Sequence, residues 1–111
     1  MSVEFQHSVR PTLEAAVQEL LPETGSIEVQ RDTSGRRHDW HTHQTDETLL
    51  IIDGELSFES ELGLKVCRPG DRILLPQGVR HASTAGVDGC IYLIALRRVS
   101  SARDANIRRE H

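Results

Sequence analysis

Hydrophobic residues near the start of the chain recur at a helical spacing. Leu13, Val17, Leu20 and Leu21 would share one face of an α-helix. A proline precedes this stretch at position 11 and another follows it at position 22, where they favour a helix start and a helix stop. The pattern predicts one short helix over about residues 11–21.

After Gly25 the pattern changes to short β-favouring segments that alternate with turn residues. The pair Asp53-Gly54 stands between an apolar run and an alternating segment, which is typical of a two-residue β-hairpin. The predicted strands are Ile27 to Val29, Thr48 to Ile52, Glu55 to Phe58, Leu62 to Cys67, Ile73 to Leu75 and Ile91 to Leu96.

Many short strands with frequent turns predict an all-β domain in which six to eight antiparallel strands form a barrel, with the helix outside it. A chain of 111 residues is the size of one domain. We expect an N-terminal segment with the short helix over residues 1–25, the barrel over 26–98, and a polar tail over 99–111. We expect the tail to be a surface helix or a frayed end.

The charge balance argues against two classes of partner. Seventeen acidic and thirteen basic residues leave a formal net charge of −4, which disfavours nucleic acid or an anionic membrane surface. The apolar runs are too short to span a bilayer, and the acidic first twenty residues do not read as a signal peptide. Cys67 and Cys90 cannot build a disulfide framework. We therefore expect a cytoplasmic protein.

Histidine and glutamate residues gather in the middle of the chain. His41 and His43 would leave the same face of an extended strand, and Glu47 keeps that parity. His81 lies near the start of a later strand. Imidazoles with one carboxylate on rigid strands are a typical ligand set for a divalent metal ion. A His-x-His pair alone also occurs on exposed strands without any metal.

The residues around this pair resemble the two sequence motifs of the cupin superfamily. The first motif is matched by Gly35, His41, His43, Glu47 and Gly54 at the family spacing. The second is matched by Gly70, Pro76, Gly78 and His81, with Ala85 where the family has asparagine. The short segment between the motifs, residues 55–69, is similar to that of small single-domain cupins.

The resemblance implies a cupin-type barrel, also called a double-stranded β-helix or jelly roll. It implies that His41, His43, Glu47 and His81 bind one divalent metal ion inside the barrel. The ion could be Fe, Mn, Ni, Cu or Zn, because all of them accept imidazole and carboxylate ligands.

Two classes of function follow from the resemblance. The first is a metal-dependent enzyme acting on a small organic substrate, such as a dioxygenase, isomerase, decarboxylase or lyase. The alternative is a non-catalytic module that senses a small molecule or a metal together with a separate partner protein. No catalytic residue is assigned.

Strand parity gives expectations for the neighbouring side chains. If His41 faces inward, Arg37 and Asp39 face inward too and could line the pocket mouth, where Arg37 would favour an anionic substrate; a solvated strand end is the alternative. His38 and Trp40 would face away, His38 at the surface or an interface and Trp40 in core or subunit packing. Tyr92 is expected to pack with its hydroxyl satisfied rather than to act as an acid.

Two predicted strands, residues 48–52 and 91–96, are apolar at both parities. One barrel interior needs only one of the two faces of each strand. We therefore expect a second copy of the chain to cover the other face, in a homodimer with the common C2 symmetry.

Overall fold

The computed structural model describes residues 2–101, which form seven antiparallel strands and one helix. The polar tail predicted over residues 99–111 lies for its greater part outside the described residues. The elements in chain order are β1 (Glu4–His7), α1 (Leu13–Leu20), β2 (Glu28–Asp32), β3 (Arg37–His41), β4 (Glu47–Ser60), β5 (Gly63–Cys67), β6 (Asp71–Leu75) and β7 (His81–Ala95).

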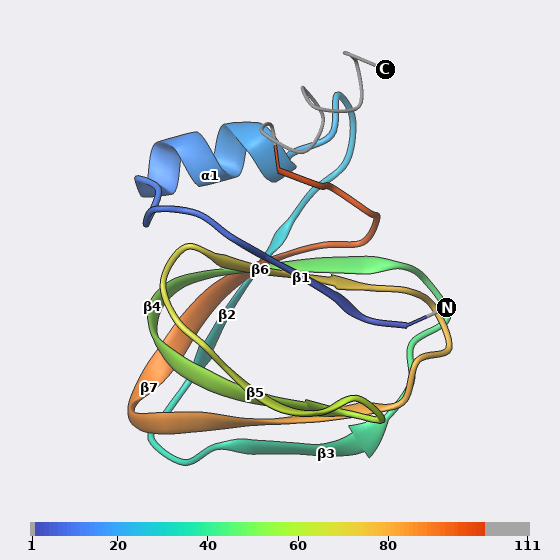
Figure 1. Cartoon of the computed structure of the whole chain (residues 1–111). Coiled ribbons are helices and arrows are strands. Elements are labelled where there is room, and N and C mark those ends of the chain that lie inside the picture. The colour runs from blue at the N-terminus through green and yellow to red at the C-terminus, as the bar shows by residue number, and fades with distance from the viewer. Residues whose placement is uncertain (1, 102–111) are drawn as a thin grey trace.

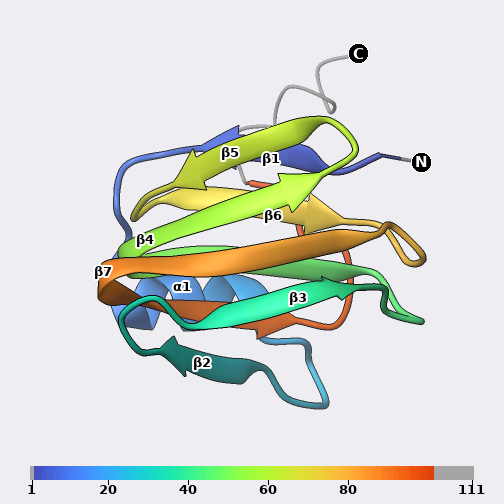
Figure 2. The ribbon, with the colours of Figure 1, turned by 90° about the horizontal axis from the view of Figure 1, so that it is seen from below.

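Two layers of strands share the long strands β4 and β7 (Figures 1 and 2). In one layer, the first half of β4 and the second half of β7 lie between β6 and β2. β1 extends this layer beyond β6. We call it the helix-side layer, because α1 packs on its outer face. The far layer consists of β5, the second half of β4, the first half of β7, and β3. The predicted all-β jelly-roll architecture with one helix is confirmed.

The prediction of a β-hairpin at Asp53-Gly54 is wrong. β4 runs through this pair without reversing, and its pairing with β7 shifts register on both sides of it. Gly54 has a φ of +77°, and the partner strand has a Gly89 with a φ of +76° at the matching bend. The turn residues therefore bend two continuous strands from one layer into the other.

The bends change which face of β4 points inward. Leu49 and Ile51 on one side, and Leu56 and Phe58 on the other, all lie in the core between the layers. The two pairs have opposite parity in the sequence, because the irregular pairing at the bend adds a residue to β4. An alternation read straight through the bend would put half of the strand on the wrong face.

The helix covers the outer face of the helix-side layer. Thr12 caps its N-terminus by accepting a hydrogen bond from the Ala15 amide at 3.1 Å. Ala16 and Leu20 are fully buried against the outward side chains of β4 and β7, including Leu50 and Leu93. Both faces of these strands are thus buried within one chain, so their double-sided apolar pattern no longer argues for a homodimer.

The strand β1 was not predicted from the sequence. It pairs with β6 from Glu4 to His7, so the N-terminal segment contributes to the barrel as well as to the helix. Within residues 2–101, no helix is long and apolar enough to cross a lipid bilayer.

Candidate metal centre

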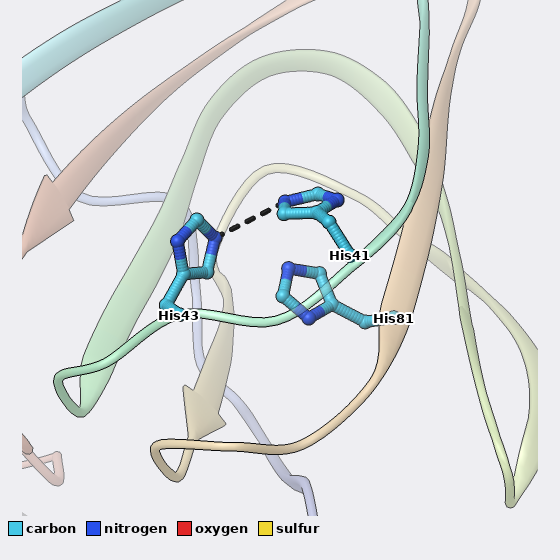
Figure 3. Close-up of side chains that lie close together, drawn as sticks. All are labelled: His41, His43 and His81. Atoms are coloured by element: carbon cyan, nitrogen blue, oxygen red, sulfur yellow. Dashed lines mark hydrogen bonds between the residues drawn. The ribbon is translucent and has the colours of Figure 1, made fainter.

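Three imidazoles converge at the end of the barrel where β3 ends and where β4 and β7 begin. His41 is the last residue of β3, His43 follows it by two positions, and His81 is the first residue of β7 (Figure 3). The backbone pairs His41 with His81 directly across the two strands. The Gly78 amide also donates a hydrogen bond to the His43 carbonyl at 2.9 Å, which ties the loop before β7 to the loop after β3.

The three rings face one another at short range. The Nε2 atoms of His41 and His43 are 3.1 Å apart, and the ring centroids of the three pairs are separated by 4.3 to 5.0 Å. One ligand atom from each ring lies within 4.8 Å of the other two. Phe58 stacks on His81 with a centroid separation of 5.5 Å and an interplanar angle of 11°, which fixes the plane of that ring.

Backbone carbonyls set the orientation of two of the rings. Nδ1 of His81 donates to the Val79 carbonyl at 2.9 Å, and Nδ1 of His41 donates to the Asp39 carbonyl. A neutral imidazole that donates from Nδ1 has its lone pair on Nε2. Both rings therefore present Nε2 as a ligand atom, which is the way proteins commonly hold metal-binding histidines.

Glu47 lies beside His43 rather than within the group of three. Its Oε2 is 3.3 Å from Nδ1 of His43, on the opposite side of the ring from the contact with His41. If Nδ1 of His43 donates to Glu47, then the lone pair of His43 is on Nε2. The lone pairs of His41 and His43 then face each other on two nitrogen atoms that are 3.1 Å apart. Two lone pairs at that distance repel each other unless a proton or a cation lies between them.

Burial disfavours the charged forms of His43, His81 and Glu47. Desolvation lowers the pKa of His81 to about 4, and it lowers the pKa of His43 with a further contribution from the neighbouring His41. Desolvation also raises the pKa of Glu47, and the charge of Glu28 adds to this effect. The lowered pKa values of His43 and His81 favour their neutral form, which is the form that metal ligation requires.

This donor set fits a divalent metal ion. It has three imidazole nitrogens within 4.8 Å of one another, two of them on rings oriented by backbone acceptors, and one carboxylate able to lower the net charge. His41, His43 and His81 would hold the ion, and Glu47 is placed either to join them or to orient His43.

A cavity of about 220 Å³ extends from these histidines into the barrel. Its walls combine apolar residues such as Leu49 and Phe58 with polar ones, including Ser83 and Tyr92. A water molecule occupies about 30 Å³, so this space suits a small organic molecule. The acidic Glu28 and Glu47 line the cavity, whereas no lysine or arginine within residues 2–101 does so.

Arg37 and Asp39 lie outside the cavity. The Arg37 guanidinium donates to Glu59 and to Thr84, each at 2.9 Å, on the outer surface of the far layer. The Asp39 side chain is 82% exposed. Of the two alternatives for these residues, the structure shows the solvated one, and the argument from Arg37 for an anionic substrate is wrong.

The expectation for His38 is also wrong, because its side chain lines the cavity. The reason is a β-bulge. From His38 to His41 the strand β3 advances three residues while its partner β7 advances two, from Ser83 to His81. The extra residue lets two side chains of opposite parity face the same way. Trp40 faces away, with the Arg80 guanidinium over its ring at 5.0 Å.

Tyr92 is buried and its hydroxyl donates to Asp32 at 2.9 Å, so the expectation of a packed, satisfied tyrosine is confirmed. Asp32 and Gln30 were not singled out from the sequence. They belong to β2, an edge strand whose Glu28, Gln30 and Asp32 alternate with outward residues. That alternation of polar residues was the one signal available, and it resembles an ordinary solvated edge.

No protein-family model and no curated protein sequence matches this chain. Solved structures do. A DUF861 family protein from Thermotoga maritima aligns over 86% of this chain and 99% of its own, with a TM-score of 0.57 and 23% identity. A cupin superfamily protein from Desulfitobacterium hafniense aligns over 87% of this chain and 79% of its own, with a TM-score of 0.57 and 15% identity.

An enzyme is also among the similar structures. Oxalate decarboxylase from Bacillus subtilis aligns over 70% of this chain and 22% of its own, with a TM-score of 0.56 and 22% identity. At these identities the likeness establishes the fold. The chain has the fold of a small cupin domain, as the two sequence motifs predict, and it carries a cluster of three histidines that could hold a metal.

Proposed function

We propose that this protein is a metal-dependent enzyme that acts on a small organic molecule inside the barrel. The observation that carries the proposal is the convergence of three imidazoles on one another beside a cavity of about 220 Å³. Several imidazoles that converge in this way are a typical ligand set for a divalent ion. The reaction class stays among those expected from the sequence: dioxygenase, isomerase, decarboxylase or lyase.

A divalent ion in this position would supply a Lewis acid that polarises an oxygen atom of the ligand. The protein residues do the remaining work. Val79 and Asp39 carbonyls fix two rings, Glu47 holds the third, and Phe58 excludes water from one side of His81. Three or four protein ligands leave room for a ligand atom on an ion that prefers six neighbours.

The metal content of untagged protein tests the proposal. We expect one divalent ion per chain in the natural sequence, and loss of that ion in His41→Ala and His81→Ala. His7→Ala is the matched control, since this histidine lies on the exposed β1 and contacts Asp71. Metal at a hundred times its Kd should stabilise the natural protein by about 2.7 kcal/mol and should not stabilise the two cluster variants.

Stoichiometric metal in both cluster variants would overturn the ligand assignment. Glu47→Gln should keep the fold and bind the ion more weakly, because it removes the ligand group's only negative charge. If the bound ion is cobalt and its spectrum changes with neither azide nor the neutral acetohydroxamic acid, the site is closed. The non-catalytic sensing module would then be the better hypothesis for the function than the enzyme.

A homodimer in the cytoplasm is also part of the proposal. Its support is now the exposed apolar side chains on edge strands, notably Val29 on β2 and Leu64 on β5, at 66% and 61% exposure. Strand edges with apolar side chains are common sites of chain association. Cys67 and Cys90 are both free and buried, which agrees with a reducing compartment.

A further inference from the structure

A second group of polar side chains lies at the same cavity as the three imidazoles. It consists of Gln30 and Asp32 from β2, His38 from β3 and Tyr92 from β7. Gln30, His38 and Tyr92 border the cavity, and Asp32 lies behind them at 1% exposure. Neither cupin motif includes any of these residues, and the proposed metal centre does not use them.

Asp32 is the centre of this group. Its Oδ1 accepts hydrogen bonds from Gln30 at 2.7 Å and from Nε2 of His38 at 2.9 Å, and its Oδ2 accepts one from the Tyr92 hydroxyl at 2.9 Å. Burial alone would raise the pKa of Asp32, but these three hydrogen bonds and the nearby His38 outweigh burial and lower it. The carboxylate is therefore a fixed negative charge inside the barrel.

His38 is held by Asp32 in a defined orientation. Because Nε2 donates to the carboxylate, the neutral ring carries its lone pair on Nδ1. Within residues 2–101, no hydrogen bond reaches Nδ1 of His38. The side chain is 28% exposed and borders the cavity, so this nitrogen is available to a molecule inside. An imidazole held by a buried carboxylate is a typical arrangement for a general base.

We propose that His38 is the proton acceptor for a small molecule bound at the imidazole cluster, and that Asp32 holds and stabilises it. This inference rests on the proposed function. The ligand's O–H bond breaks, its electron pair stays on the oxygen, and the proton forms an N–H bond at Nδ1 of His38. The resulting imidazolium is balanced by the Asp32 carboxylate, and no further reactant is needed.

The charges around the cavity indicate the class of ligand. Glu28 on β2 and Glu47 on β4 line the cavity together with His38. The other titratable residues that line it are Tyr92 and the three imidazoles His41, His43 and His81. Two acidic side chains repel an anion that enters from water. The ligand is therefore a neutral molecule that becomes an anion only inside, such as a hydroxamic acid, an enol or an α-hydroxyketone. An internal base is what such a molecule requires.

Counting protons during binding tests this directly and needs no knowledge of the natural substrate. Zinc-loaded protein is titrated with acetohydroxamic acid near pH 7.5, where an ordinary imidazole is neutral, by calorimetry in buffers of different ionisation enthalpy. If His38 takes the proton, binding to the natural protein releases almost none to the buffer. The variant His38→Gln keeps a donor for Asp32 but has no basic nitrogen, so it should release about one proton per ligand.

The matched control is His7→Gln, which makes the same change in a histidine that contacts a carboxylate outside the cavity. It should behave as the natural protein does. Asp32→Asn should also raise the proton release, because the amide does not stabilise an imidazolium. Nitrogen-15 spectra of the natural protein give an independent measurement. His38 should be protonated at Nε2 alone in the zinc-loaded protein, and at both nitrogens once the hydroxamic acid is bound.

The outcomes separate the two proposals. A protein that does not bind zinc contradicts the proposed function. If zinc and the hydroxamic acid both bind, but the natural protein releases a full proton or His38→Gln releases no more than the natural protein, then the proposed function stands and the role of His38 is wrong. If the nitrogen-15 spectra show that His38 stays singly protonated with the ligand bound, the role of His38 is also wrong. This measurement uses the natural protein, so it holds even if a variant fails to fold.

Discussion

The Asp32 carboxylate shows how one residue can be buried and charged at the same time. A carboxylate without partners would be strongly disfavoured at 1% exposure. Here three donors from three side chains occupy its oxygens, and hydrogen bonds to a charged group are stronger than those to a neutral one. The stability that Asp32 contributes therefore depends on its ionisation.

We expect Asp32→Asn to lower the free energy of unfolding by about 1.5–3 kcal/mol at pH 7. The difference between variant and natural protein should shrink in acid. The pKa of Asp32 in the folded state lies below its ordinary value of 3.8, so its contribution is complete above that value. The contribution is lost as the pH falls through the lower folded-state pKa.

Urea denaturation of both proteins between pH 7 and pH 2.5 measures this difference. Asp88→Asn, at an exposed position in the bend of β7, should show almost no difference at any pH. A cost for Asp32→Asn that stays constant across the pH range would contradict the ionised state argued for this residue.

At the scale of the elements, the bends in β4 and β7 determine what the barrel can enclose. Each strand serves both layers, and each changes its inward parity at the bend. Gly54 and the backbone of Gly89 touch at this point. A Cβ atom on Gly54 would lie 2.1 Å from the Gly89 carbonyl oxygen, which is closer than atoms can approach.

Gly54→Ala should therefore be strongly destabilising, by roughly 3 kcal/mol or more, because it combines backbone strain with a clash between main chains. Gly35→Ala is the matched control. Gly35 has a similar φ of +71°, but a Cβ atom there would meet nothing within 4 Å. It should cost only the backbone strain, about 1–2 kcal/mol. If thermal or urea denaturation shows that the two variants lose the same free energy of unfolding, the close approach of the strands does not contribute to the cost of Gly54→Ala.

At the scale of the whole molecule, the helix and the barrel together bury both faces of the central strands. The core between the layers and the core under α1 lie on opposite sides of β4 and β7. Arg72 adds a polar link, because its buried guanidinium donates to Glu19 of the helix at 2.7 Å and to the Val99 carbonyl at 2.8 Å. A second copy of the chain is therefore not needed to cover these strands.

The proposed homodimer must instead form at the strand edges. Light scattering at micromolar concentration should give twice the 12.5 kDa mass of one chain. Leu64→Lys places a charge on the edge strand β5 and should shift the mass towards that of one chain. Val87→Lys, at a residue that is 87% exposed near the bend of β7, should leave the mass unchanged. A natural protein with the mass of one chain would contradict the dimer.

The sequence by itself determined the features that depend on near neighbours. Helix α1 follows from the spacing of its apolar residues and its prolines, although the buried face turned out to centre on Ala16 and Leu20, with Leu13 56% exposed. The cupin fold and the approach of His41, His43 and His81 follow from motif spacing, because those residues flank the turns that define the strand ends.

Only the tertiary structure decided which side chains of a strand face the cavity. A single extra residue in β3 brings His38 inward, and the bend at Asp53-Gly54 reverses the parity of β4 instead of closing a hairpin. The partner of His38 is Asp32 on another strand, which no spacing in the sequence connects to it. The physical reason is that an extended strand has a period of two residues, so one bulge exchanges its faces, and bulges arise from pairing between strands that are distant in the chain.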